Sequence, residues 1–252
     1  MITFIVPAFN EEGNIAPTVA TIRAAVAESG VGDVEILLID DGSTDGSAAE
    51  MAALAAADPR VRCIVNPRNL GLGASIRVGI GAAGGSAFMV IPGDNDVPKE
   101  LMLMMLHFRD EADAILTAPL NKEQRNLARN IVSMLYQMAY MVMFQTYVSY
   151  INGPGIWPTA AARDAGLKAD RFSIIAELNV KVLRMGCTFA EVPGYFQAGP
   201  KARSTVTLRN LAEVIKSFFR LAVDVHIRGR DRFKGRPVRK QINFVSRLQS
   251  RT

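Results

Sequence analysis

Short apolar runs alternate with amphipathic segments through the first hundred residues of the chain. The β-branched run at residues 2–6 is too short for a helix and stops at Pro7, so it predicts a buried strand. Apolar runs of similar length follow at residues 34–39, 61–65 and 88–91. Between them, residues 15–29, 47–57 and 73–83 have the composition and spacing of helices, and Gly30 stands where the first would be capped.

This alternation predicts βαβ units and a parallel sheet. Ligands of such sheets bind beyond the carboxyl ends of the strands. Four polar motifs fall at these ends, at residues 7–12, 40–45, 69–73 and 94–96. Together they predict a site for a sugar nucleotide and its metal ion.

The Asp-Asn-Asp motif supplies the expected metal ligands. Asp94 and Asp96 flank one residue in an extended segment, so both carboxylates can face the same hard cation. Mg²⁺ or Mn²⁺ bridging a diphosphate suits such a pair, because an oxygen-liganded ion keeps positions open for phosphates. Taken alone, the pair would fit an ordinary solvated turn better, and the other three motifs reverse that preference.

The other motifs suit a nucleotide. Phe9 beside Pro7 offers an apolar wall for a base, and Asp41 can accept hydrogen bonds from N–H groups of the base. A plain core position remains the alternative for Phe9. Residues 69–73 lack the Gly-Lys-Ser/Thr ending of a phosphate loop, so their glycines more simply allow the chain to turn closely against the sheet.

These motifs, quoted as residues 6–12, 39–47, 69–74, 93–96 and 191–193, resemble the inverting GT-A glycosyltransferases of family 2. Within that family the chain is most similar to the dolichol-phosphate and polyprenyl-phosphate mannosyl- and glucosyltransferases. The resemblance is strong to about residue 100 and looser to about residue 206. It implies a single, mostly parallel, Rossmann-like sheet flanked by helices, and a nucleotide-diphosphate sugar as donor.

The resemblance also implies roles for individual residues. The donor would be bound by Pro7, Phe9, Glu11, Asp40 and Asp41. Asp94 and Asp96 would match the metal and diphosphate ligands of the family, with Asp96 counted among the catalytic residues.

Basic residues are expected to stabilise the leaving diphosphate. Arg125 and Arg129 lie four residues apart on an expected helix, and Arg129 resembles an arginine of the family. A solvated helix face is the alternative for both. Lys201 and Arg203 stand in an altered form of a later family motif, which leaves open which of them reaches the phosphates.

Glu177 falls where the family places an acidic residue, and it is the candidate general base. If the acceptor is a lipid phosphate, its oxygen is already ionised and no base is required. Glu177 would then orient loops or bind a cationic partner, or simply form a salt bridge.

Two later segments suggest a membrane. Residues 131–151 contain no charge and four of the tyrosines, which suits an interfacial or acceptor-lipid helix, a core helix or a spanning segment. Residues 209–227 form an amphipathic helix that would dock on the catalytic domain or lie in a membrane surface. Residues 228–252 hold nine Lys/Arg and one Asp, a net charge of +8, so the rest of the +5 chain has −3.

A basic tail favours anionic lipid. A nucleic-acid partner is not expected, because the tail has only two aromatic residues and no binding module, while a solvated tail is the alternative. The expected organisation is a catalytic domain at 1–206, with a nucleotide-sugar half at 1–100 and an acceptor-side half at 101–206. An amphipathic helix at 207–227 and the tail at 228–252 follow.

The compartment expected from the sequence is the cytoplasm, with peripheral attachment at the inner face of the membrane or through a membrane protein. Cys63 and Cys187 are too few for a disulfide framework, and with His107 and His226 they form no zinc pattern. The chain starts directly in an expected strand, so no signal peptide is expected.

The sequence thus predicts a metal-dependent inverting glycosyltransferase that acts on a lipid-linked or membrane-proximal acceptor. It lacks the Gln-x-x-Arg-Trp motif of processive synthases. A sugar-1-phosphate nucleotidyltransferase is a weaker alternative, because no Gly-rich loop ending in Arg and Lys follows the first strand. A non-catalytic sugar-nucleotide-binding or membrane-adaptor protein is the alternative from another class.

Overall fold

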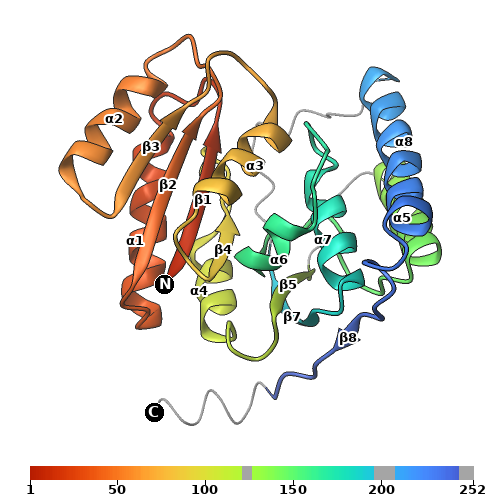
Figure 1. Ribbon diagram of the computed structural model, residues 1–252. Coiled ribbons are helices and arrows are strands. Elements are labelled where there is room, and N and C mark those ends of the chain that lie inside the picture. Colours follow the sequence, from red (N-terminus) through yellow and green to blue (C-terminus); the bar gives the residue numbers. More distant parts are fainter. Residues whose placement is uncertain (121–126, 196–207, 244–252) are drawn as a thin grey trace.

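The computed structural model describes residues 1–120, 127–195 and 208–243. Within them, one eight-stranded sheet has the order β3-β2-β1-β4-β6-β5-β7-β8 (Figure 1). All neighbouring strands are parallel except that β6 runs antiparallel to both β4 and β5. The expected mostly parallel, Rossmann-like sheet is therefore confirmed.

The first half of the chain follows the apolar pattern closely. Its elements are β1 (Ile2–Ala8), α1 (Ile15–Ser29), β2 (Val34–Asp40), α2 (Ser47–Ala57), β3 (Val61–Val65), α3 (Leu72–Ala82) and β4 (Ala87–Val90). Gly30 caps α1 in the left-handed region, with φ of 72°, as its sequence position predicts.

The second half is less regular. Its elements are α4 (Lys99–His107), β5 (Ala114–Pro119), α5 (Leu127–Phe144), β6 (Gly155–Pro158), α6 (Thr159–Asp164), α7 (Ile174–Arg184), β7 (Thr188–Gly194), α8 (Leu208–Val223), a π-helical turn (Asp224–Arg228) and β8 (Val238–Arg239).

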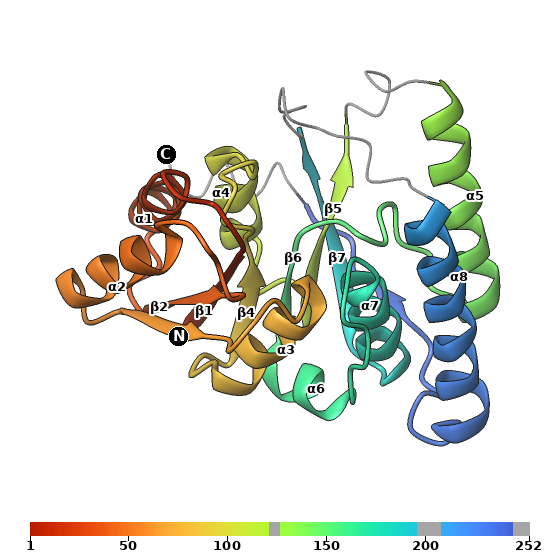
Figure 2. The same ribbon diagram turned by 90° about the horizontal axis from the view of Figure 1, so that it is seen from above.

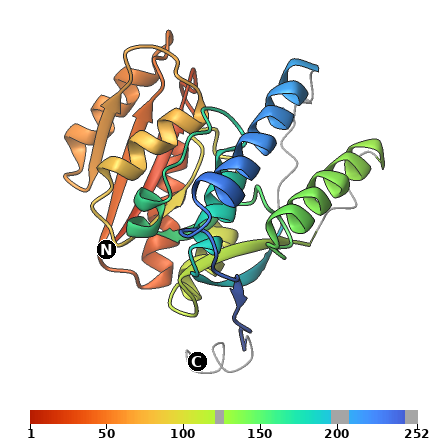
Figure 3. The ribbon, with the colours of Figure 1, turned by 45° about the vertical axis from the view of Figure 1, so that its right-hand side comes forward.

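Successive residues along a strand point to opposite faces of the sheet, and they pack into two separate hydrophobic cores. Phe4 and Leu38 pack with α1, α2 and α4, whereas Ile5 and Leu37 pack with α3 and α7 (Figure 2). Both faces of the central strands β1 and β2 are buried, and these strands are mostly apolar. Their buried polar side chains Thr3 and Glu35 are hydrogen-bonded to each other at 2.7 Å. Helices α5 and α8 lie side by side beyond α7, away from α1 and α2 (Figures 2 and 3).

The prediction of one continuous helix over residues 131–151 is wrong. Helix α5 ends at Phe144, and Gln145 takes a positive φ of 55°. The chain then turns back, and the Gln137 side chain donates to the carbonyl of Val148 and accepts from the N–H of Ile151. Val148 and Ile151 are buried, so the end of the uncharged segment belongs to the core. Among the helices that the structure describes, none has the length and apolarity to cross a bilayer.

The first part of the basic segment folds back onto the domain. Phe233 is buried, and Nε of Arg184 donates to its carbonyl at 2.9 Å. Strand β8 pairs with β7, and Arg239 forms an ion pair with Glu191 at 2.9 Å. The alternative of a disordered, solvated tail is therefore wrong for residues 228–243 as far as disorder is concerned, although most of their side chains are exposed.

Candidate active site

The loops after β1 and β2 hold each other through side chains of the first two polar motifs. The N–H of Asn10 donates to Oγ of Ser43 at 3.0 Å, and Oδ1 of Asn10 accepts from the N–H of Thr44 at 2.8 Å. The N–H of Glu11 donates to Oγ of Ser47 at 2.8 Å. These reciprocal bonds explain why both loops are rich in small polar residues, and they fix the carboxyl ends of β1 and β2 as one frame.

Within this frame, the residues expected to bind the donor lie at the carboxyl ends of β1 and β2, which we call the donor edge of the sheet. Phe9 is exposed, so the alternative of a plain core position is wrong. Pro7 is buried within β1, which continues to Ala8, so the expectation that the strand stops at Pro7 is wrong. Glu11 is partly buried, and its Oε2 accepts from Nδ2 of Asn14 at 2.8 Å. The ring of Phe9 is therefore available to a ligand at this edge.

Asp40 and Asp41 are both buried. Asp40 closes its own turn, because its Oδ1 accepts from the N–H of Ser43 at 3.0 Å. Asp41 accepts from Nδ2 of Asn66 at 2.9 Å and from the N–H groups of Leu70 at 3.0 Å and Gly71 at 2.8 Å. Asp41 thus holds the glycine-containing loop, and a carboxylate retains lone pairs for a further N–H donor.

The glycine-containing loop packs closely against backbone, as its glycines predict, but the partner is not the sheet. A Cβ on Gly71 or Gly73 would collide with the carbonyls of Asp170 and Ala169, and Gly71 has a φ of 94°. The N–H of Gly73 donates to the carbonyl of Asp170 at 2.8 Å. The start of α3 is therefore occupied by protein, which argues against a phosphate loop at this position.

The Asp-Asn-Asp motif is attached to β1 and α1. The N–H of Gly93 donates to the carbonyl of Pro7 at 3.0 Å. The expectation of an extended segment is wrong here, because residues 93–95 form a turn in which Asn95 has a φ of 58°. Oδ1 of Asn95 accepts from Oγ1 of Thr21 at 3.0 Å. This geometry keeps Asp94 and Asp96 beside the β1 loop, at the edge where the donor residues gather.

The electrostatics of this motif suit a cation. Partial desolvation raises the pKa of Asp94, although its side chain keeps access to water. The negative charges of Asp96 and Glu11 raise this pKa further, whereas a hydrogen bond from the N–H of Asp96 lowers it. A divalent ion would relieve this excess of negative charge. No group of three or more His, Cys, Asp or Glu side chains that could hold a metal occurs in the described part of the chain. Two carboxylates still fit Mg²⁺ or Mn²⁺, since both ions complete their shells with phosphate oxygens and water.

Glu177 lies in α7 and is buried. Its carboxylate accepts from the N–H groups of Lys168 at 3.1 Å and Ala169 at 2.7 Å, and from Nζ of Lys181 at 2.7 Å. These contacts favour a loop-orienting, salt-bridged role over that of a general base.

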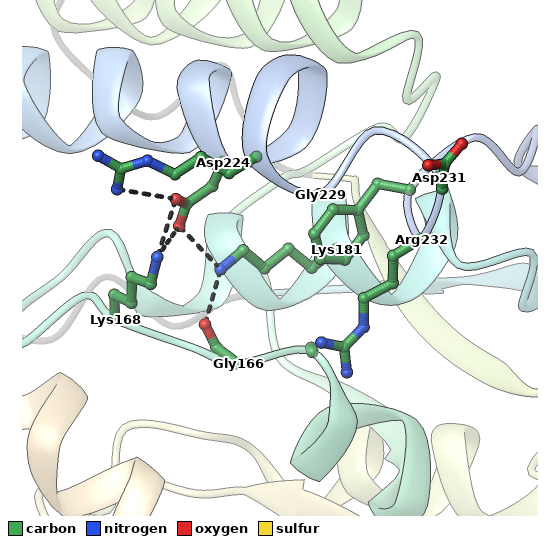
Figure 4. A pocket seen from close by; sticks show the side chains of 10 residues that line it. Gly166, Lys168, Lys181, Asp224, Gly229, Asp231 and Arg232 are labelled. Atoms are coloured by element: carbon green, nitrogen blue, oxygen red, sulfur yellow. Dashed lines mark hydrogen bonds and ion pairs between the residues drawn. The ribbon is translucent and has the colours of Figure 1, made fainter.

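Lys181, which the sequence analysis did not single out, links Glu177 to the C-terminal helices. Its buried Nζ also donates to the carbonyl of Gly166 at 2.8 Å and lies 3.5 Å from Oδ2 of Asp224 (Figure 4). Lys181, Gly166 and Asp224 line a pocket of about 370 Å³ together with Lys168. No sequence motif surrounds Lys181, and a lysine within a helix is common, so the sequence alone does not distinguish it from a surface residue.

The remaining expected phosphate ligands are not described. Arg129 lies in α5, but its side chain falls outside the described part, and Arg125, Lys201 and Arg203 lie outside the described residues altogether.

Comparisons with known proteins agree with this arrangement. The model of the family "Glycosyl transferase family 2" matches residues 3–169. Curated relatives include a succinoglycan biosynthesis protein of Rhizobium meliloti, 39% identical over 45% of this chain and 31% of the relative. A dolichyl-phosphate beta-glucosyltransferase of Trichomonas vaginalis is 32% identical over 36% of this chain and 28% of the relative. The chain thus spans about a third of the length of these curated relatives.

Solved structures share the fold. Glucosyl-3-phosphoglycerate synthase of Mycobacterium tuberculosis, in complex with Mn²⁺, uridine diphosphate and phosphoglyceric acid, gives a TM-score of 0.60 at 16% identity, over 89% of this chain and 78% of the other. Mannosyl-3-phosphoglycerate synthase of Rubrobacter xylanophilus gives a TM-score of 0.62 at 15% identity, over 92% and 75%. The sheet, the loops at its edge and the family match agree, and the chain belongs to glycosyltransferase family 2, with the GT-A fold.

Proposed function

We propose that this protein transfers a sugar from a nucleotide-diphosphate donor to a lipid-linked, polyprenyl-phosphate-like acceptor, with a divalent cation and inversion of the anomeric centre. The observation that carries the proposal is the convergence of Phe9, Glu11, Asp94 and Asp96 at one edge of the sheet. Relatives are named as a succinoglycan biosynthesis protein, a dolichyl-phosphate beta-glucosyltransferase and an undecaprenyl-phosphate 4-deoxy-4-formamido-L-arabinose transferase, which supports this class of reaction.

The donor would lie across the joined loops after β1 and β2. Phe9 would stack on the base, and Asp41 would accept an N–H of the base while holding the loop at Gly71. Asp94 and Asp96 would hold Mg²⁺ or Mn²⁺ against the diphosphate. Bound there, the cation would offset negative charge on the departing nucleoside diphosphate.

A phosphate acceptor is consistent with the contacts of Glu177. The acceptor oxygen of a lipid phosphate is ionised at neutral pH, so it attacks without a general base, from the side opposite the diphosphate. The carboxylate of Glu177 is already engaged by Lys181 and by backbone N–H groups, which supports a reaction that does not use it as a base. Arg129, Lys201 and Arg203 remain proposed phosphate ligands.

The proposed setting is the cytoplasmic surface of a membrane, where a lipid-linked acceptor is met. In this proposal residues 1–206 form the catalytic domain, with the donor half before residue 100, and residues 207–252 contribute to attachment. Anionic lipid, with or without a membrane-protein partner, is the proposed attachment surface.

The decisive experiment measures the melting temperature with UDP-, GDP- and CMP-linked sugars, each with Mn²⁺ and with EDTA. A metal-dependent rise with one donor is expected, and it identifies the base. Release of the nucleoside diphosphate in the presence of a polyprenyl phosphate then tests transfer. Binding without release would favour a non-catalytic adaptor, and the absence of any shift would reject the donor site.

A further inference from the structure

Helices α5 and α8 are joined by an aromatic cluster between them. The rings of Tyr140 and Phe144 on α5 lie 5.1 Å and 5.4 Å from the ring of Phe218 on α8. Tyr140 and Phe144 are buried in the core cluster that also includes Leu221 of α8. One face of each helix therefore packs against the other helix and against the domain beneath it.

Outside this contact, both helices also have a face that is apolar and exposed. On α5 this face presents Met134, Met138 and Val142, and on α8 Ile215, Phe219 and Val223, each set at intervals of four residues. We name these six residues the α5–α8 face. Val142 is 78% exposed and Phe219 61% exposed. Several exposed apolar residues on two helices that pack together mark an interaction site, whereas single exposed apolar residues do not.

In the described part of the chain, the charges that are not paired near this face are basic. Residues 133–147 contain no charged side chain. On α8, Lys216 and Arg220 each follow an apolar residue of the face, and Lys216 is exposed. The acids in the described side chains of α8 and its π-helical turn are otherwise engaged: Glu213 pairs with Arg171 at 3.3 Å, and buried Asp224 pairs with Lys168 at 2.7 Å.

We propose that the α5–α8 face docks on an anionic lipid surface, with Met134, Val142 and Phe219 entering the interface and Lys216 and Arg220 at the headgroups. Apolar side chains bordered by basic ones are the pattern of helices that lie in a membrane interface. A second copy of the chain fits less well, because a two-fold contact would bring Lys216 and Arg220 against their counterparts. The inference rests on the proposed function, since it names the surface that meets a lipid-linked acceptor.

The test is co-sedimentation of the full chain with vesicles of phosphatidylcholine alone and of phosphatidylcholine and phosphatidylglycerol in equal parts. We expect binding to the anionic vesicles that weakens as salt is added. Val142→Glu and Phe219→Glu should each weaken this binding by about tenfold or more, because a carboxylate replaces an inserted apolar group.

Val65→Glu is the matched control, since Val65 is 59% exposed at the end of β3 and lies outside the α5–α8 face. It should bind as the unchanged protein does. Equal binding of Val142→Glu and Val65→Glu, or no preference for anionic vesicles, would overturn the proposal. A dimer in solution that Val142→Glu converts to a monomer, without vesicle binding, would assign the face to a second copy instead.

Truncation at residue 228 is a poor substitute for these variants, because it removes the buried ring of Phe233 together with the basic residues. Donor-induced stabilisation of Val142→Glu shows that the variant is folded. It also separates the two proposals: loss of vesicle binding with donor binding intact concerns the face, whereas vesicle binding without any donor shift concerns the proposed function.

Discussion

Glu177 and Lys181 form a buried ion pair one turn apart on α7, with Nζ of Lys181 2.7 Å from Oε1 of Glu177. The same Nζ lies 3.5 Å from Asp224, which follows α8. Oε2 of Glu177 accepts from the N–H of Ala169, whose neighbour Asp170 accepts from the first turn of α3. The pair therefore connects the end of α8 with the segment that supports the start of α3 and, through it, the proposed donor-binding loops.

Replacing Lys181 by Met should destabilise the protein by about 3–5 kcal/mol, because the buried carboxylates of Glu177 and Asp224 lose a shared cation. Urea unfolding followed by circular dichroism measures this change. The double variant Lys181→Met with Glu177→Gln removes one charge of each sign and should be more stable than Lys181→Met alone. Equal stability of the two variants would contradict the ion-pair account.

Glu177→Gln also separates an anchoring role from a catalytic one. A general base contributes about 10²–10⁴ to the rate, so its loss would lower kcat by that factor and change the pH profile. If Glu177 anchors residues 168–170, the variant should mainly raise KM for the donor and keep the pH profile. Steady-state kinetics with donor and acceptor varied separately distinguish the two results.

A methyl group at Gly73 should disturb the same support. Its Cβ would meet the backbone of Ala169 and Asp170, which cannot move aside as a side chain would. We expect Gly73→Ala to cost about 1–3 kcal/mol in unfolding free energy and to weaken donor binding. Gly81→Ala, in the same helix with open space around it, is the control and should be neutral or stabilising by up to about 1 kcal/mol. Equal effects of the two changes would reject the close contact.

The first half of the fold could be predicted because each strand and helix there has its own local pattern. The bounds expected for residues 15–29, 47–57 and 61–65 are those observed, and Gly30 caps α1. Period-two and period-3.6 patterns, with glycine at helix ends, determine such elements with little help from distant contacts.

The second half depended on contacts that no local pattern contains. The uncharged run at residues 131–151 gave no sign of a helix end at Phe144, because the turn after it is stabilised by Gln137 reaching Val148 and Ile151. The same holds for the candidate site. The sequence identified the motif residues, but it did not show which of them hold the loops and which remain available to a ligand. Asp41, for example, holds the glycine-containing loop through the N–H groups of Leu70 and Gly71, and these contacts exist only in the folded chain.

Glu35 is expected to contribute to stability in a pH-dependent way. Burial acts to raise its pKa, but hydrogen bonds from Gly84, Thr3 and Arg62 outweigh this effect and leave the pKa below its ordinary value. The unfolded chain therefore binds the proton more readily than the folded one. This contribution is present above the ordinary pKa of about 4.5 and is lost as the pH falls through the lower, folded value. Glu35→Gln should reduce the slope of unfolding free energy against pH below about 4.5, measured by urea unfolding; an unchanged slope would contradict it.

Alanine at Asp94 or Asp96 tests the proposed metal ligands. Each variant should keep the fold, because Asp94 and Asp96 are exposed, and each should lose the Mn²⁺-dependent rise in melting temperature with donor. Removing one ligand of the cation should lower turnover by about a hundredfold or more, since the charge on the leaving diphosphate is then poorly compensated.

Asp110→Ala is the matched control for these two variants, because it removes an exposed carboxylate after α4 that takes no part in the donor edge. Isothermal titration with Mn²⁺ and the donor, alone and together, distinguishes loss of the metal from loss of the nucleotide. If Asp94 and Asp96 bind the cation against the diphosphate, their variants should still bind the nucleoside through the β1 and β2 loops, but without a dependence on metal. Donor binding that stays metal-dependent in both variants would move the cation to other residues and reject this assignment.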